Sequence, residues 1–310
     1  AGSIYSGGLT NPSTLANPNL KPLKTTTYEA GANVKMFKSR LTIDVSLYSG
    51  YTKNQILDRV VDRSSGYTRT IINAGRVDNK GLELALSGTP LQTRSGFKWN
   101  VNIIYSANRN EITALADSSV VLRTGPVGGG QIVAKVGGSM GDLYGRGYVR
   151  APDGQIVYDA KTGFALLSPD VVYLGNTIPK GKIGLTNEFR YKGFRLSLLF
   201  DAQFGGVAHS LTHYKLAEQG KLIKTLPGRY NGIIGNGVVL DASGKYVPNT
   251  TITTDIDDYY RSHWGIDNAE GSTFSTDFIK FREARFDYTL NPAFTKRLGL
   301  QRVTVGVYGR

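Results

Sequence analysis

Apolar and polar residues alternate one by one along eight segments of this chain, and this period of two constrains its fold more than any other feature. In the first segment, residues 27–36, one face carries Tyr28, Ala30, Ala32, Val34 and Met36. Successive side chains of a β-strand point to opposite faces, so each segment is expected to be a strand with one apolar side. About ten residues suffice for a strand that crosses a bilayer at a tilt. The other segments are residues 41–47, 82–87, 97–106, 183–191, 194–204, 283–290 and 303–307.

The links between these segments alternate between short and long. Residues 38–40, 89–96, 192–193 and 291–299 are short links, whereas residues 49–69, 108–179 and 205–276 are long and rich in Gly, Asn, Asp, Ser and Tyr. Tight turns on one side and long loops on the other are typical of outer-membrane barrels, with the turns in the periplasm. A soluble β-sandwich is the alternative, but its links would vary irregularly in length. The pattern predicts an all-β fold, a segment of a transmembrane antiparallel β-barrel with about eight strands.

Composition excludes several other classes of protein. The mean hydropathy is −0.22 and no run approaches the roughly 20 apolar residues of a transmembrane helix. Cysteine is absent, which excludes a disulfide framework, a zinc–thiolate cluster and a cysteine nucleophile. The formal net charge is +13, but Lys and Arg are scattered singly between apolar residues, so we expect no nucleic-acid partner.

The two ends of the chain suggest that it is part of a longer protein. Residues 1–8 have neither the basic nor the apolar region of a signal peptide. The chain stops at Arg310, inside the last alternating segment, which would leave an unpaired strand edge. We therefore expect the remaining strands to come from residues outside this sequence.

Three motifs resemble the SusC/RagA family of TonB-dependent outer-membrane transporters. Residues 17–21 leading into residues 28–32 resemble the family's entry from a loop into a strand, and residues 277–290 are similar to an Arg- and Leu-rich strand of the family. The most specific match is residues 72–84, which resemble the family pattern N-x-G-x-x-x-N-x-G-x-E. The resemblance spans residues 17–310 and departs from the family at Pro22, where Trp is usual, and at Asn291, where Leu is usual.

The resemblance implies that residues 1–310 are the C-terminal part of a barrel of about 22 strands, with the plug domain, the N-terminal segment and the last strands absent. It also implies a location in the bacterial outer membrane and import of oligosaccharides or peptides, coupled to the TonB complex. The implied partners are a SusD-like surface lipoprotein, a glycan or peptide ligand and outer-membrane lipid. The family implies neither enzymatic activity nor a cofactor.

Recognition of a ligand or partner is expected in the two longest loops, residues 108–179 and 205–276. Turns this short cannot hold a binding surface, and the apolar faces are committed to lipid. Loop tyrosines can stack on sugar rings or pack against a partner protein, although plain loop packing explains them equally well. The candidate binding residues are Tyr144, Tyr148, Tyr173, Asp255, Asp257, Asp258, Tyr259 and Tyr260.

Metal binding is not expected. Asp255, Asp257 and Asp258 lack the ligand spacing and turn glycine of a calcium loop, so a solvated loop explains them better. His209 and His213 are four residues apart, which suits a metal on a helix, but no glutamate lies between them and no third ligand is near in the sequence.

Three classes of function remain open on this sequence. An active importer is favoured by the family resemblance alone. A passive porin has the same strand pattern, and a soluble β-rich glycan-binding or adhesion module has the same loop composition. A plug domain in the complete protein would separate the importer from the porin, and partitioning without detergent would identify the soluble module.

Overall fold

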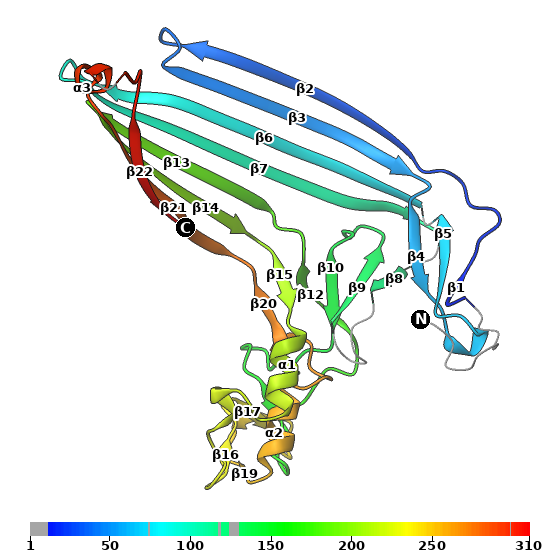
Figure 1. Ribbon diagram of the computed structural model, residues 1–310. Helices are drawn as coiled ribbons and strands as arrows, with labels where there is room; N and C mark the ends of the chain where they lie inside the picture. Colours follow the sequence, from blue (N-terminus) through cyan, green and yellow to red (C-terminus); the bar gives the residue numbers. More distant parts are fainter. Residues whose placement is uncertain (1–11, 74, 117–118, 124–129, 298) are drawn as a thin grey trace, which may run out of the picture.

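Eight long strands form one antiparallel sheet, in the order β2-β3-β6-β7-β13-β14-β21-β22 (Figure 1). The structure is a computed structural model that describes residues 12–73, 75–116, 119–123, 130–297 and 299–310, so the expectation for residues 1–8 lies outside the described part. The sheet confirms the predicted all-β barrel segment, and it is open between β2 and β22. Its strands are β2 (Lys24–Met36), β3 (Leu41–Lys53), β6 (Gly75–Gln92), β7 (Phe97–Leu115), β13 (Gly181–Tyr191), β14 (Phe194–Phe204), β21 (Phe278–Thr289) and β22 (Thr304–Gly309).

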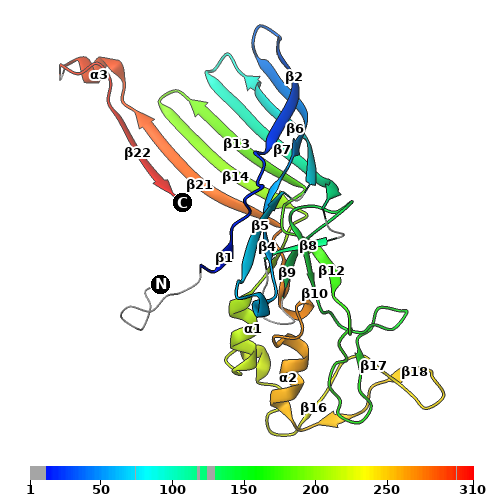
Figure 2. The ribbon, with the colours of Figure 1, turned by 90° about the vertical axis from the view of Figure 1, so that its right-hand side faces the viewer.

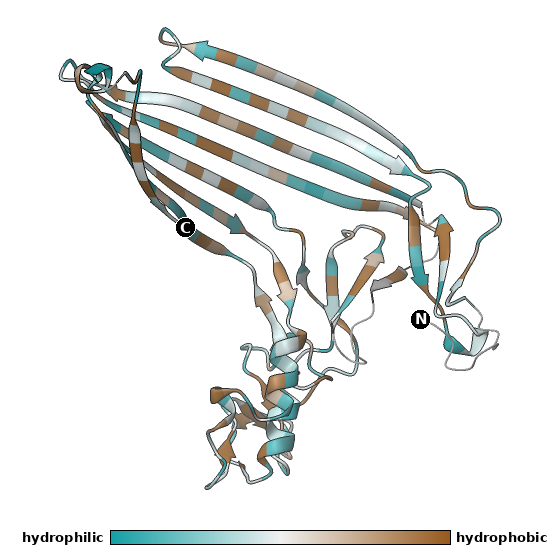
Figure 3. Cartoon of the chain, in the orientation of Figure 1, coloured by the Kyte–Doolittle hydropathy of each residue, from teal (hydrophilic) through white to brown (hydrophobic). Residues whose placement is uncertain are grey.

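The register of the sheet gathers apolar side chains on one face. Paired residues across seven adjacent strands form an unbroken apolar row, Val34, Ile43, Leu86, Ile103, Leu185, Phe200 and Phe281. The neighbouring row points to the other face and is polar from β2 to β13, with Lys35, Thr42, Ser87, Asn102 and Thr186. Brown and teal bands alternate along the strands accordingly (Figure 3). We call these two sides the apolar face and the polar face.

The strand lengths fit a bilayer. β13 and β14 have 11 residues each, which corresponds to about 37 Å of strand and, at a tilt near 40°, to a height of about 28 Å. The apolar face has one polar interruption in β13, Asn187, whose side-chain oxygen accepts a hydrogen bond from Trp99 Nε1 at 3.1 Å. That bond satisfies an amide oxygen that would otherwise be unpaired in hydrocarbon.

A β-bulge in β21 keeps its charged residues on the polar face. Leu199 of β14 pairs with Glu283 and Phe200 pairs with Phe281, so Arg282 is an extra residue without an opposite partner. Before the bulge Ile279 and Phe281 share the apolar face, and after it the apolar positions are Ala284, Phe286 and Tyr288. Arg282 donates two hydrogen bonds to Asp201, which lies on the polar face. The strand therefore begins at Phe278, five residues before the alternating segment that the sequence suggests.

The polar face carries a charged network toward the end of the sheet where the short turns lie, which we call the turn end. Glu188 accepts hydrogen bonds from Arg190 and Arg195, each at 2.6 Å. Arg195 also pairs with Asp287 at 3.6 Å, and Arg285 binds the same carboxylate. This wall is therefore both polar and internally cross-linked.

Structure at the opposite end, the loop end, is more regular than the sequence suggests. β3 continues to Lys53, and most of the predicted first loop is a hairpin of β4 (Ile56–Val60) and β5 (Arg69–Asn73), with β1 (Thr14–Leu15) added beside β5 and η1 (Arg63–Ser65) at its tip. A second sheet has the order β12-β10-β9-β8. Its strands are β8 (Ser119–Arg123), β9 (Gln131–Lys135), β10 (Asp142–Gly145) and β12 (Val172–Asn176).

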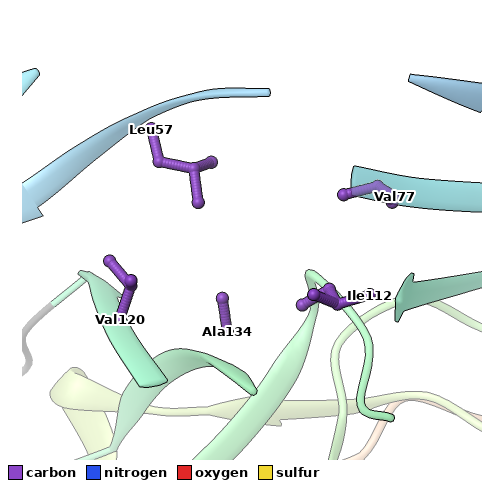
Figure 4. Close-up of a cluster of buried hydrophobic side chains, with 5 residues drawn as sticks. All are labelled: Leu57, Val77, Ile112, Val120 and Ala134. Carbon is purple, nitrogen blue, oxygen red and sulfur yellow. The ribbon is translucent and has the colours of Figure 1, made fainter. Parts of the chain in front are cut away.

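A small apolar core joins these loop strands to the ends of β6 and β7. It consists of Leu57, Val77, Ile112, Val120 and Ala134, each at most 6% exposed (Figure 4). Ile112 is anchored further by the backbone, because its N–H donates to Gly138 O and its carbonyl accepts from Gly137 N–H. The strands of the barrel therefore extend beyond the apolar band and hold the loop strands in place.

The third long link, together with residues 148–167, folds into a helical unit beyond this core, which we call the loop subdomain (Figure 2). It is connected to β14 and β21 through the paired strands β15 (Val207–His209) and β20 (Thr273–Ser275). Its helices are α1 (Leu211–Glu218) and α2 (Ile256–Trp264), with the short turns η2 (Ile223–Thr225) and η3 (Glu270–Ser272). Its short strands are β11 (Val157–Tyr158), β16 (Ile233–Ile234), β17 (Val238–Leu240), β18 (Tyr246–Pro248) and β19 (Ile252–Thr253).

The link between β21 and β22 differs from the short turn that the sequence suggests. Residues Pro292–Arg297 form a helix, α3, at the turn end. Pro292 starts the helix, where its missing N–H costs nothing. None of the helices in the described ranges is long and apolar enough to cross a membrane.

Candidate functional site

A large cavity lies at the loop end, between the barrel strands and the loop strands. Its volume is about 1140 Å³, which exceeds the size of a pocket for a drug-sized molecule. β3, β6 and β7 line one side, the segment from β9 to β10 lines another, and β12 with the residues before β13 completes the wall. We take this cavity as the candidate functional site.

Tyr48 and Gly81 shape the barrel side of the cavity. The two residues pair directly across β3 and β6, and a Cβ at Gly81 would overlap the Tyr48 ring. The ring therefore lies across the glycine, and its hydroxyl donates to Asn108 Oδ1 at 3.1 Å. These three positions share the polar face with Glu83 and Ser106. Only glycine leaves room for this arrangement.

The loop side is fixed to β7 by a buried polar junction. Asn110 Oδ1 accepts hydrogen bonds from Ser139 Oγ at 2.7 Å and from the N–H of Met140 at 2.8 Å. Asp142 accepts from the N–H of Ser139 at 2.8 Å and is only 6% exposed. Because these groups satisfy one another, they position the cavity wall and are not free to bind a ligand.

Two of the predicted binding residues, Tyr144 and Tyr173, line the cavity together. They lie on the paired strands β10 and β12, and their rings meet edge to face with centroids 5.6 Å apart. Tyr173 is 55% exposed, so its ring is available for stacking. Burial raises the pKa of both phenols, with the nearby Asp142 carboxylate adding to the effect, so both keep their protons at neutral pH.

The accessible charges on the cavity are positive. Lys135 and Lys180 line it and are exposed, and within the described residues neither forms an ion pair. Lys80 also borders the cavity, but its side chain belongs to the apolar face of β6. The two carboxylates of the lining are engaged: Asp142 is buried, and Glu111 pairs with Arg109 at 3.7 Å. A mobile ligand therefore meets ammonium groups, amides and tyrosines.

Three other predicted binding residues, Tyr148, Tyr259 and Tyr260, lie inside the loop subdomain. Tyr259 and Tyr260 are each 5% exposed and belong to its apolar core, and Tyr148 packs against that core. The Tyr148 hydroxyl donates to His263 O at 2.7 Å, and the Tyr260 hydroxyl donates to Pro227 O at 2.9 Å. In this conformation these rings hold the subdomain together, and ligand binding through them stays a prediction.

The acidic group Asp255, Asp257 and Asp258 belongs to the first turn of α2. Asp255 is the N-cap and accepts a hydrogen bond from the N–H of Asp258, and Asp257 pairs with Arg261 at 3.0 Å. Carboxylates at a helix N-terminus are stabilised by the backbone dipoles. The sequence did not predict this helix. A role of the three residues in binding stays a prediction.

Of the three histidines His263 is buried and His209 and His213 are half-buried, and the pKa of each is lowered. Burial lowers the pKa of His263 to about 4; its Nδ1–H donates to Tyr259 O at 3.1 Å, and its Nε2 accepts from the Tyr158 hydroxyl at 2.9 Å. Burial also lowers the pKa values of His209 and His213. His209 lies in β15 and His213 in α1, so the two do not share a helix. The described residues contain no cluster of three or more His, Cys, Asp or Glu side chains placed to hold a metal ion.

The motif in residues 72–84 has a structural explanation. The Asn73 side chain forms two hydrogen bonds with the backbone of Lys21: Nδ2 donates to Lys21 O and Oδ1 accepts from Lys21 N–H, each at 2.8 Å. Gly75 has a φ of +123° and would clash with Ala114 if it carried a Cβ. Sequence reasoning overlooked Tyr48 and Asn108 as cavity residues, because their positions follow from the pairing register and not from a motif.

Comparisons with known proteins agree with this architecture. A family model described as TonB dependent receptor-like, beta-barrel matches residues 1–178. A TonB-dependent receptor of Formosa agariphila is 24% identical over 317 residues, covering 95% of this chain and 30% of that protein. The TonB-dependent receptor SusC of Bacteroides thetaiotaomicron is 25% identical over 207 residues, covering 62% of this chain and 20% of that protein.

Among solved structures, that of the RagAB peptide transporter superposes with a TM-score of 0.67 at 18% identity, covering 94% of this chain and 32% of that chain. The 'closed-closed' state of the RagAB peptide importer gives the same TM-score. At this identity the likeness shows the fold alone. The chain spans less than a third of the length of the curated relatives named above.

Proposed function

Since this chain belongs to the TonB-dependent receptor-like β-barrel family, whose barrels lie in the bacterial outer membrane, we propose that it forms part of an active importer. The cargo is an oligosaccharide or a peptide, and uptake is coupled to the TonB complex. A SusD-like surface lipoprotein assists at the loop end. Members of the family are transporters, and the chemistry of the site is therefore binding and passage.

The observation that carries the proposal is the continuity between the polar face and the cavity. Tyr48 and Asn108 line the cavity and lie on the same face as the hydrogen-bonded network of Glu188, Arg195 and Asp287. A polar polymer thus has hydrogen-bonding partners from the loop end toward the turn end. The apolar face is occupied by lipid and offers no such path.

The proposed lipoprotein partner has a suitable surface on the loop subdomain. Large apolar side chains face solvent there, including Ile223, 85% exposed, and Tyr230, 97% exposed. Exposed apolar groups of this kind mark surfaces that pack against another protein. The long links, residues 108–179 and 205–276, are therefore our proposed recognition elements for both cargo and partner.

Uptake by whole cells tests the proposal. Cells that carry the complete receptor would be given a fluorescent oligosaccharide or peptide, with and without a functional TonB complex. We expect accumulation only when both are present. Deleting residues 205–276 while the barrel still inserts is expected to abolish both uptake and co-purification of the lipoprotein; if both persist, the proposed role of this link is wrong.

Two other functions give different results in the same assay. A passive porin would admit the cargo at the same rate in cells without TonB. A soluble glycan-binding or adhesion module would be recovered without detergent. The structure argues against such a module, because the continuous apolar row from Val34 to Phe281 would expose apolar side chains on seven strands to water.

A further inference from the structure

We infer that the cavity at the loop end binds an anionic oligosaccharide, one that carries carboxylate or sulfate groups. This inference rests on the proposed function, since it names the class of cargo for the same site. It begins with the charges that a ligand can reach. Two lysines, Lys135 and Lys180, line the cavity with their side chains exposed.

These ammonium groups have no anionic partner within the described part of the chain. Most other charged groups on the polar face are paired, as in Glu188 with Arg190 and Asp201 with Arg282. The lining contributes two carboxylates, but Asp142 is buried and bound to the Ser139 N–H, and Glu111 pairs with Arg109. Lys135 and Lys180 are thus unpaired cations beside a lining whose own carboxylates are engaged. An anionic ligand is therefore attracted electrostatically, in a partly enclosed site where screening by salt is weaker than at an open surface.

The remaining lining suits sugar rings. The exposed ring of Tyr173, held edge to face by Tyr144, offers a flat apolar surface for the C–H side of a pyranose. Asn108 and Asn176 add amide groups that can bond ring hydroxyls. A flat aromatic surface surrounded by amides and ammonium groups matches a chain of acidic sugars, in which each unit has one apolar side, several hydroxyls and a negative charge.

Binding of defined probes to the complete purified receptor in detergent tests this inference. The probes are an oligogalacturonate, a sulfated galactan oligosaccharide, a neutral malto-oligosaccharide and an oligoglutamate, all of the same length. We expect the two acidic sugars to bind at least about tenfold more tightly than the neutral one, a difference that corresponds to about 1.4 kcal/mol. That preference is expected to shrink as the salt concentration rises.

The variants Lys135→Gln and Lys180→Gln test whether the preference for acidic sugars arises in the cavity. Each is expected to weaken acidic-sugar binding three- to tenfold while neutral-sugar binding stays unchanged, and Lys180→Arg is expected to restore most of the affinity. Lys245→Gln is the matched control, because Lys245 is an exposed loop lysine outside the cavity lining. Loss of acidic-sugar binding only in the cavity variants supports the inference.

Two results would overturn it, and a third separates it from the proposed function. Equal affinity for neutral and acidic sugars would exclude an anionic ligand, while import of sugars could still occur. Tighter binding of the oligoglutamate than of either acidic sugar would assign the site to acidic peptides. If the receptor binds an acidic sugar but TonB-dependent uptake of every probe is absent, the proposed import fails and the assignment of the cavity stands.

Discussion

Leu198 offers a direct test of which face of the sheet contacts lipid. It lies near the middle of β14 and pairs with Asn187 and Ala284 on the apolar face. Replacing it by arginine places a charge near the bilayer midplane, which costs about 2–4 kcal/mol in outer-membrane barrels. Thr186→Arg is the matched control, because Thr186 belongs to the neighbouring strand but lies on the polar face, where we expect a change within about 0.5 kcal/mol.

The assay is the folding free energy of the complete receptor in lipid vesicles, measured by urea titration with the shift in gel mobility of folded barrels as the readout. Leu198→Arg is expected to lower the free energy of unfolding by about 2–4 kcal/mol relative to wild type, and Thr186→Arg to leave it nearly unchanged. Equal losses for the two variants would refute the assignment of the faces. A loss confined to Thr186→Arg would reverse it.

Three further predictions follow from the loop end. Gly81→Val forces the Tyr48 ring away, and we expect the free energy of unfolding, measured by urea titration, to fall by about 1–3 kcal/mol. The same substitution in a Tyr48→Ala background is expected to cost less, and equal costs would contradict the contact between the two residues. Asn73→Ala leaves the N–H and carbonyl of Lys21 without their side-chain partner, and faster protease cleavage near Lys21 is expected; an unchanged rate would show that the Asn73 side chain does not hold this segment in place. Burial lowers the pKa of His263 from 6.5 to about 4. The stability that depends on the neutral imidazole is therefore fully present above pH 6.5, and the free energy of unfolding falls by about 3 kcal/mol as the pH falls toward 4. Pulse proteolysis of the loop subdomain between these pH values measures the fall, and His263→Phe is expected to flatten the pH profile.

The sequence predicted the barrel strands well because one physical rule governs all of them. Each strand separates lipid from a polar interior, so period-two alternation marks it regardless of its neighbours. The eight alternating segments coincide with the eight strands of the large sheet. Their ends were harder to place: β7 continues through Asn110 to Leu115, because beyond the apolar band a strand no longer needs an apolar face.

The loops could not be predicted in the same way, since their structure depends on contacts between distant residues. Tyr148 and His263 are 115 positions apart, yet a hydrogen bond joins them, and nothing in the local pattern marks either as interior. Likewise, Tyr144 and Tyr173 were candidates from residue type alone, and only the pairing of β10 with β12 brings their rings together. A period of 3.6 over the nine residues of α2 is too short a signal to separate from loop sequence.

The bulge at Arg282 gives β21 one residue more than its pairing with β14 uses. If Arg282 paired opposite Phe200 as a regular strand residue, the segment before it would face the wrong way, because a shift by one residue reverses the face of every side chain. Lys280 would then point into the membrane together with Phe278, while Ile279 and Phe281 would turn toward the interior. Removing Arg282 would instead close the bulge, with Phe281 opposite Phe200 and Glu283 opposite Leu199 as consecutive pairs, so the other side chains would keep their faces and only the ion pair with Asp201 would be lost. We therefore expect a strand that lacks this one residue to present the same side chains to lipid.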